Sequence, residues 1–207
     1  MIIAIDGPAA SGKGTLGKRL SEHFGFAHLD TGLLYRAVAR VLLDRGLDLN
    51  DRDAATHVAQ TLDVTHLDDH RLRGAEMGEA ASVISAFQPV RDALLAFQRQ
   101  FAEQPPGAVL DGRDIGTVVC PHADVKLFIT AAPEERARRR YNEVLKRGER
   151  VEYETILADI RRRDERDMNR STAPLRPAED AVTLDTTHLD ADAAFRAALD
   201  LVEGRNR

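Results

Sequence analysis

Short apolar runs alternate along this chain with longer segments in which apolar residues recur every three or four positions. The first run, at 2–6, is followed by a glycine-rich loop and by a helical repeat at 13–24 that stops at Gly25. Four further runs predict strands, at 26–29, 108–111, 125–130 and 182–185. Strands that alternate with helices predict an α/β fold with a parallel sheet covered by helices on both faces.

The other repeats predict the helices around this sheet. Asp30 and Thr31 stand where they can cap a helix that runs to about Arg45. Further helices are expected at 51–62, 75–87, 89–103, 134–150 and 151–170, and the polar stretch 64–74 leaves room for one short strand. Ligands of such sheets bind beyond the carboxyl ends of the strands. The residues expected there are Asp6, Asp30, Asp111 and Thr130.

The segment GPAASGKGT has the form of a phosphate-binding loop, and we expect phosphate groups to be held by its residues Gly7, Pro8, Ala9, Ala10, Ser11, Gly12, Lys13, Gly14 and Thr15. Its glycines let backbone N–H groups converge on phosphate oxygens, and Lys13 adds a charge for the outer phosphates. Such loops usually continue with a Ser or Thr that binds Mg²⁺, but Gly14 stands there. A GTPase switch needs that hydroxyl, whereas a kinase of a small phosphorylated acceptor can hold Mg²⁺ mainly through phosphates and water.

Composition narrows the class of protein. The 207 residues suit one domain, and no apolar run approaches the ~20 residues of a membrane span. The lone Cys120 excludes an internal disulfide, and the N-terminus does not resemble a signal peptide, so we expect a cytoplasmic protein. The net charge of -5 disfavours nucleic acid as a partner, yet residues 136–170 carry 12 of the 29 Lys and Arg residues against 8 of the 34 Asp and Glu residues. This region is expected to meet anions.

One predicted helix changes character halfway along one face. Ile156, Ile160, Arg163, Asp167 and Arg170 follow one another at spacings of four and three residues, so they share a face that turns from apolar to charged. We expect the charged end to leave the core and line a cleft. The alternative is a solvated face held by pairs worth only ~0.2–0.5 kcal/mol each.

Two other segments are candidates for phosphate chemistry. A basic helix places Arg136, Arg139 and Arg140 on neighbouring positions, as arginines on a movable flap would lie during phosphoryl transfer, although it can equally be an ordinary charged helix.

The segment DGRD follows a strand. Asp111 could hold a Mg²⁺-bound water, Arg113 a phosphate and Asp114 a donor on the acceptor, or the segment could be a plain turn.

Six segments together resemble bacterial cytidylate kinase, a family of P-loop nucleoside monophosphate kinases. They are, in order across residues 2–177, GPAASGKGT, DTGLLYR, AASVISAFQPVR, VLDGRDIGTVV, KLFITAAPEERARRR and RRRDERDMNRSTAPL. The resemblance implies transfer of the γ-phosphoryl group of ATP, with Mg²⁺, to CMP or dCMP. It also implies a P-loop NTPase core with a lid at about 136–155 and an acceptor-binding insert at about 51–104, in a single domain over 1–207.

The resemblance also assigns roles to individual residues. The catalytic set would be Lys13, Arg113, Arg139 and Arg140. The loop at 7–15 would bind ATP. The acceptor set would be Thr31, Arg36, Ser82, Arg91, Arg113, Asp114, Arg163, Asp167 and Arg170. In this set Arg36, Arg113 and Arg170 would hold the phosphate, Ser82, Arg91 and Asp114 would face the base, and Arg163 and Asp167 would face the sugar. Without the resemblance, Ser82 is expected inside a helix and Arg91 on the surface.

The chain departs from many relatives between Val64 and Ala80, where they carry extra short strands, so the insert is expected to be trimmed. Other acceptors remain open for the same core, namely UMP, AMP, shikimate and dephospho-CoA, as does a non-catalytic ATP-binding module. We expect ATP and CMP or dCMP as the partners of a monomer that binds no nucleic acid and no membrane.

Overall fold

The computed structural model describes residues 1–64, 67, 70–72, 74–148 and 150–205, with Ala75 and Arg205 described by their backbones alone. Parts of the polar stretch at 64–74, and so of the expected insert, lie outside the described residues, as does residue 149 of the expected lid. Within that stretch, His70–Leu72 forms a 3₁₀ helix, η2, where a short strand had seemed possible.

In the described part of the chain, five parallel strands form one sheet with the order β2-β3-β1-β4-β5. The strands are β1 (Ile2–Asp6), β2 (Ala27–Asp30), β3 (Ala108–Gly112), β4 (Val125–Thr130) and β5 (Val182–Asp185). Each lies within one residue of its predicted bounds. The central position of β1 places the glycine-rich loop that follows it at the middle of the sheet's carboxyl edge.

Eight α-helices are described, and the first seven fall where the apolar repeats predict them. They are α1 (Lys13–Phe24), α2 (Gly32–Asp44), α3 (Arg52–Gln60), α4 (Ala75–Ile84), α5 (Gln88–Ala102), α6 (Pro133–Lys146), α7 (Tyr153–Asn169) and α8 (Ala191–Arg205). A short π-helix, η3 (Ile115–Val119), follows β3. Among the described residues, no helix is both long and apolar enough to cross a membrane.

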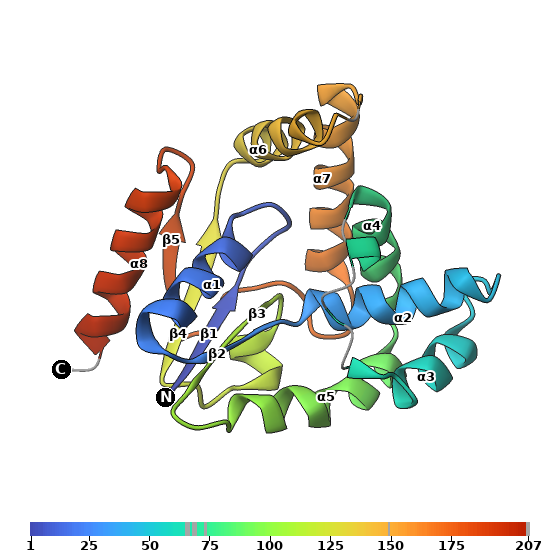
Figure 1. Cartoon of the computed structure of the whole chain (residues 1–207), viewed down its shortest axis with the longest axis horizontal. Coiled ribbons are helices and arrows are strands. Elements are labelled where there is room, and N and C mark those ends of the chain that lie inside the picture. The colour runs from blue at the N-terminus through green and yellow to red at the C-terminus, as the bar shows by residue number, and fades with distance from the viewer. Residues whose placement is uncertain (65–66, 68–69, 73, 149, 206–207) are drawn as a thin grey trace.

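Alternate residues of the central strand enter two separate cores. Ile3 and Ile5 pack with α1 and α8 on one face, whereas Ala4 packs with α2, α4 and α5 on the other. Figure 1 shows α1 and α8 on one side of the sheet and α2 to α5 on the other. The sheet is therefore covered on both faces, as its nearly continuous apolar strands require.

Helices α6 and α7 form an arm with a small core of their own. That core contains Ala137, Val144, Ile156, Leu157 and Ile160. In Figure 1 the arm lies at the end of the molecule where the glycine-rich loop follows β1. The arm thus stands beside the carboxyl edge of the sheet, where ligands of this architecture bind.

The buried side chain of Arg136 fastens this arm to the sheet. Its guanidinium makes a two-pronged pair with Asp164 of α7, at 3.1 and 2.6 Å, and donates to the carbonyl oxygens of Ala9 and Ala131 at 3.1 and 2.8 Å. Arg136 is only 3% exposed. The expectation that it belongs to a mobile set of phosphate-gripping arginines is therefore wrong, because all of these bonds are internal to the fold.

We predict that Arg136→Met lowers the free energy of unfolding by about 3–5 kcal/mol, because it leaves the Asp164 carboxylate buried and unpaired. The matched control is Arg138→Met on the same helix, where the arginine is exposed and pairs with Glu135, and there the loss should be about 0–1 kcal/mol. Urea unfolding of both variants measures the difference. Equal, small losses would show that Arg136 is not a fastening residue.

Candidate active site

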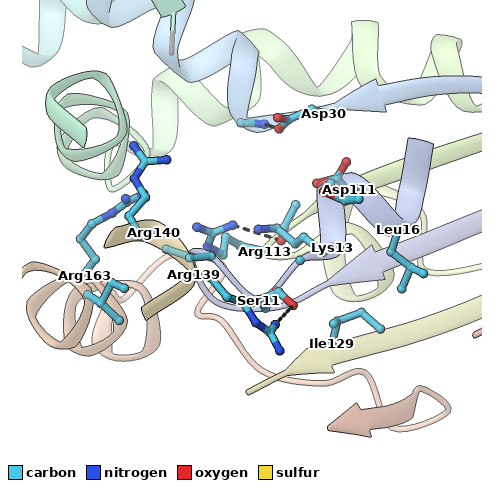
Figure 2. A pocket seen from close by; sticks show the side chains of 18 of the residues that line it. Ser11, Lys13, Leu16, Asp30, Asp111, Arg113, Ile129, Arg139, Arg140 and Arg163 are labelled. Carbon is cyan, nitrogen blue, oxygen red and sulfur yellow. Dashed lines mark hydrogen bonds between the residues drawn. The ribbon is translucent and has the colours of Figure 1, made fainter. Parts of the chain in front are cut away.

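A cavity of 630 Å³ opens at the carboxyl edge of the sheet. It is lined by all the predicted site residues except Gly7 and Pro8, together with parts of α1, α2, α4, α6 and α7. Figure 2 shows Lys13 and Arg113 near the centre of this cavity, with Asp30 and Asp111 to one side and Arg140 and Arg163 to the other. Residues from six distant segments therefore meet in one space.

Gly7 shapes the loop through packing. A Cβ atom at Gly7 would lie 2.1 Å from the carbonyl oxygen of Ile129 in β4, so only glycine lets the chain leave β1 this close to the neighbouring strand. Further along the loop, Ala10 and Gly12 have φ angles of 58° and 91°. These left-handed residues turn the loop so that α1 begins with its positive end toward the cavity.

Lys13 is buried at the start of α1. Its Nζ donates to the carbonyl of Pro8 at 3.3 Å. Burial, helped by the neighbouring charges of Arg113 and Arg36 and opposed by those of Asp111 and Asp30, lowers the pKa of Lys13 to about 7. A lysine held in this way gains a full charge most readily when an anion enters the cavity.

Arg163 and Arg170 lie in the cavity with guanidinium nitrogens that the described carboxylates leave without a partner. Burial, with a further contribution from the charge of Arg113, lowers the pKa of Arg163 to about 10. Its Nε atom is buried and finds no hydrogen-bond partner among the described residues, and the same holds for Nη2 of Arg170. Orphaned guanidinium nitrogens are costly inside a protein unless an anion satisfies them.

The charged end of the α7 face lines the cavity, as the spacing predicts. Asp167 is 4% exposed and bonds to partners on other elements, accepting from Nε of Arg113 at 2.9 Å and from the hydroxyl of Ser82 at 3.1 Å. Burial raises the pKa of Asp167, but the charge and hydrogen bond of Arg113 more than offset this, so the net shift is downward. The solvated-face alternative is therefore wrong for Asp167.

A second buried network lies where α5 meets η3. A guanidinium nitrogen of Arg91 donates to the Asp114 carboxylate, and another donates to the carbonyl of Ser85 at 3.1 Å. The Arg91 guanidinium also lies 5.5 Å from the centre of the Tyr35 ring. Arg91 and Asp114 are buried, so the surface position expected for Arg91 from its residue type alone is wrong.

Two carboxylates form the opposite side of the cavity. Asp30 and Asp111 are paired in register on neighbouring strands and so point to the same face of the sheet. Burial raises the pKa of Asp30, and the nearby Asp111 carboxylate raises it further. A Cβ atom on Gly14 would lie 3.7 Å from Oδ1 of Asp111, so the position that usually carries the metal-binding hydroxyl faces a carboxylate here.

This arrangement fits Mg²⁺ brought in with a nucleotide. No group of three or more His, Cys, Asp or Glu side chains in the described part of the chain could hold a metal by itself. Mg²⁺ keeps several waters and is commonly held by one or two carboxylates together with substrate phosphates. Asp111, with Asp30 beside it, supplies that kind of site.

Arg139, Arg140 and Thr31 were also predicted to belong to the site, and in the structure each bonds to other parts of the protein. Arg139 donates to the carbonyl of Ser11 at 3.4 Å and to Thr186, while Arg140 pairs with Glu143 at 3.3 Å near the surface. The Thr31 hydroxyl was expected to cap α2, but it donates to the carbonyl of Asp111 at 2.9 Å.

One wall of the cavity was not predicted at all. It consists of Arg19, Thr186 and the segment 189–191, where Nη1 of Arg19 donates to the carbonyl of Ala191 at 2.8 Å. Arg19 is held there by an ion pair with Asp192 at 2.9 Å. No sequence motif marks Arg19 or the stretch 186–191. Only their position near the carboxyl edge of the sheet could have indicated that they line the cavity.

A model of the cytidylate kinase family matches residues 3–203. The chain belongs to the cytidylate kinase family. Among curated members, a cytidylate kinase of Methylocella silvestris is 62% identical over 98% of this chain and 94% of that relative. One from Rhodopseudomonas palustris strain BisB5 is 61% identical over the whole of both chains.

Solved structures share the fold at much lower identity. An uncharacterized protein from Eubacterium ventriosum aligns with a TM-score of 0.56 and 17% identity, over 99% of this chain and 98% of that chain. A protein from Thermus thermophilus aligns with a TM-score of 0.50 and 21% identity, over 100% and 98%. The architecture of this cytidylate kinase family member therefore extends beyond recognisable sequence similarity.

We predict that Gly78→Ala weakens the acceptor site without weakening the fold. A Cβ atom on Gly78 would lie 2.9 Å from Nη1 of Arg163, so the guanidinium must move, and its displacement should raise the KM for the acceptor about tenfold, as the loss of one charged hydrogen bond does. Alanine also favours the helix by ~1 kcal/mol. Gly204→Ala is the control, because open space surrounds Gly204 in α8. If Gly78→Ala left the KM for the acceptor unchanged, the position of the Arg163 guanidinium beside Gly78 would not matter for acceptor binding.

We predict that ATP binding near pH 7 takes up a proton at Lys13. With its pKa at about 7 in the free protein, about half of the lysine is neutral there, and added phosphate charge raises that pKa. Calorimetry in buffers of different ionisation enthalpy measures the uptake, which Lys13→Met should reduce by roughly half a proton. The exposed Lys18→Met is the control. Identical uptake in both variants would contradict the assignment.

Proposed function

We propose that this chain transfers the γ-phosphoryl group of ATP to CMP or dCMP, giving ADP and CDP or dCDP. The observation that carries the proposal is that the phosphate loop and the incompletely neutralised arginines line one cavity. Two phosphate-bearing molecules can meet there with their charges offset. The family and the named relatives support the same reaction.

The roles of the residues follow from their positions in the cavity. The loop's N–H groups and Lys13 hold the outer phosphates of ATP, while Arg36, Arg113 and Arg170 hold the phosphate of the acceptor. Arg163 and Asp167 face its sugar. An oxygen of the acceptor phosphate attacks the γ-phosphorus, and the bond to the oxygen bridging the β- and γ-phosphates breaks, releasing ADP. Positioning and fixed positive charge supply most of the catalysis in such a transfer.

The network of α4, α5 and η3 suits a cytosine base. Cytosine presents an amino donor beside two acceptors. The Asp114 carboxylate can accept from the amino group and the Arg91 guanidinium can donate to the acceptors. The Ser82 hydroxyl donates its proton to Asp167, so its oxygen is a second acceptor for the amino group. Their existing hydrogen bonds fix their orientation before the base enters, which reduces the cost of ordering them.

The acceptor and donor nucleosides would bind at opposite ends of the cavity. The base-reading network occupies one end, so the donor nucleoside would lie at the other, against Arg19, Thr186 and the segment 189–191. We further propose that residues 136–155 act as a lid, from which Arg139 and Arg140 contribute catalytic charge. Residues 51–104 would form a trimmed acceptor-binding insert, with Ser82 and Arg91 as its contributions.

Mg²⁺ bound with ATP would neutralise part of the phosphate charge, and Asp111 would hold it through water with Asp30 nearby. We propose that the enzyme acts as a monomer in the cytoplasm, where its nucleotide substrates occur and where a lone buried thiol such as Cys120 stays reduced. Sedimentation of the purified chain tests the monomer.

An acceptor panel tests the proposed reaction. With ATP and Mg²⁺, we expect ADP release to depend on CMP or dCMP, with kcat/KM about 10² or more above that for UMP, AMP, shikimate or dephospho-CoA. Uracil places a carbonyl against the carboxylate, and sites that hydrogen-bond a substrate reject such mismatches by up to ~10⁴–10⁵. Asp114→Asn should narrow the CMP-to-UMP gap, mainly by losing CMP activity, because an amide can offer either a donor or an acceptor.

The exposed Asp92→Asn on α5 is the control for this substitution. If Asp114→Asn left the ratio unchanged, Asp114 would not read the amino group. Another preferred acceptor would replace CMP in the proposal, and nucleotide binding without any acceptor-dependent turnover would favour the ATP-binding module.

A further inference from the structure

We infer that Asp6 is a positioning residue that ties the phosphate loop to the segment that reads the acceptor base, an inference that rests on the proposed function. Asp6 ends β1, and the next residue, Gly7, begins the phosphate loop. Its Oδ1 accepts from the N–H of Ile115 at 2.7 Å, and its Oδ2 accepts from the N–H of Gly116 at 2.8 Å. Both donors directly follow Asp114.

These two bonds fix the peptide group that carries Asp114. The N–H of the peptide joining Asp114 to Ile115 is held by Asp6, while its carbonyl oxygen accepts from Val118 and Val119 at 2.9 and 3.1 Å. With both polar atoms bound, the plane of this peptide cannot rotate freely. The direction in which the Asp114 side chain leaves the backbone is therefore set in part from β1.

The sheet register explains why Asp6 can reach this segment. Asp6 pairs with Gly112 across the β1–β3 ladder, one position beyond the pair of Ile5 with Asp111. Because side chains alternate along a strand, Asp6 and Asp111 point to opposite faces of the sheet. Asp111 faces α1 and the phosphates, and Asp6 faces η3 on the other side, where the chain has turned after Arg113 and Asp114.

The contact is close and specific to a carboxylate. A Cβ atom on Gly116 would lie 3.4 Å from Oδ2 of Asp6, so the backbone approaches the carboxylate as glycine allows. Burial raises the pKa of Asp6 to about 7 even though the N–H groups of Gly116 and Ile115 lower it. Burying this group is thus costly, and an apolar residue would serve packing better. Unlike an apolar residue, the carboxylate of Asp6 provides one oxygen for each of the two N–H donors.

The test compares Asp6→Asn with Asp124→Asn. Asparagine has the shape of aspartate but turns an NH₂ group toward one of the two N–H donors, so one hydrogen bond is lost. Asp124 is a matched control, because its Oδ2 also accepts a β1 backbone N–H, that of Ile2 at 2.6 Å, at the strand's far end. Both variants are measured for KM and kcat with CMP, UMP and ATP, and for amide hydrogen exchange at Ile115 and Gly116.

We expect Asp6→Asn to raise the KM for CMP about tenfold or more, as one lost hydrogen bond to a charged group does, and to narrow the CMP-to-UMP ratio. Exchange at the two amides should accelerate, and Asp124→Asn should change none of these quantities. A folded Asp6→Asn variant with the wild-type KM and ratio would overturn the inference, as would an equal effect of Asp124→Asn.

Two further measurements keep the result decisive. If Asp6→Asn does not fold, Asp6→Ser is measured instead: its single, shorter hydroxyl cannot serve both N–H donors, so it should produce the same changes in KM and ratio, whereas wild-type values there would overturn the inference. If the wild-type protein shows no CMP-dependent turnover, the proposed function has failed. Protection of the Ile115 and Gly116 amides, which needs no substrate, then shows separately whether Asp6 holds this segment.

Discussion

The concentration of buried positive charge at one edge of the sheet is the constraint on which the rest of the structure depends. Burial lowers the pKa values of Lys13 and Arg163, and the nearby charge of Arg113 adds to both shifts, because little water is left to screen these charges from one another. A group of buried positive charges is tolerated only if anions neutralise it. The protein supplies part of that neutralisation itself, through the ion pair of Arg113 with Asp167. The remainder is left for phosphates, which is why the cavity is suited to joining two nucleotides.

Two arginines of the basic segment show how the same residue type is divided between support and chemistry. The guanidinium of Arg136 donates its hydrogen bonds to Asp164 and to the carbonyl oxygens of Ala131 and Ala9, so it holds the arm against the phosphate loop. Arg140, on the next turn of the same helix, faces the cavity and has only an exposed carboxylate as partner. The same helix therefore carries a buried arginine that supports the fold and, one turn further on, an arginine at the cavity whose partner is the exposed Glu143.

The sequence predicts the elements better than it predicts the contacts between them. Strands and helices follow from local periodicity, and the α7 face could be recognised because its apolar stripe becomes charged at Arg163. The burial of Arg91 could not be foreseen, because its partner Asp114 lies on another element and no local pattern joins them. The wall around Arg19 and Thr186 was missed for the same reason. In the stretch 64–74, polar residues without periodicity gave no basis for choosing between a strand and the 3₁₀ helix at His70–Leu72.

The glycines at 7, 14 and 78 illustrate why motif positions need a structural explanation as well as a family one. Gly7 belongs to the loop motif, but it is required by the carbonyl of Ile129 and does not line the cavity. Gly14 stands where such loops usually carry a hydroxyl and faces the carboxylate of Asp111, which we propose holds Mg²⁺ through water in its place. Gly78 lies outside every quoted motif, yet it gives Arg163 the room to approach α4. The absence of a side chain thus makes room for a strand carbonyl at Gly7, a carboxylate at Gly14 and a guanidinium at Gly78, and only the neighbours of each glycine reveal which.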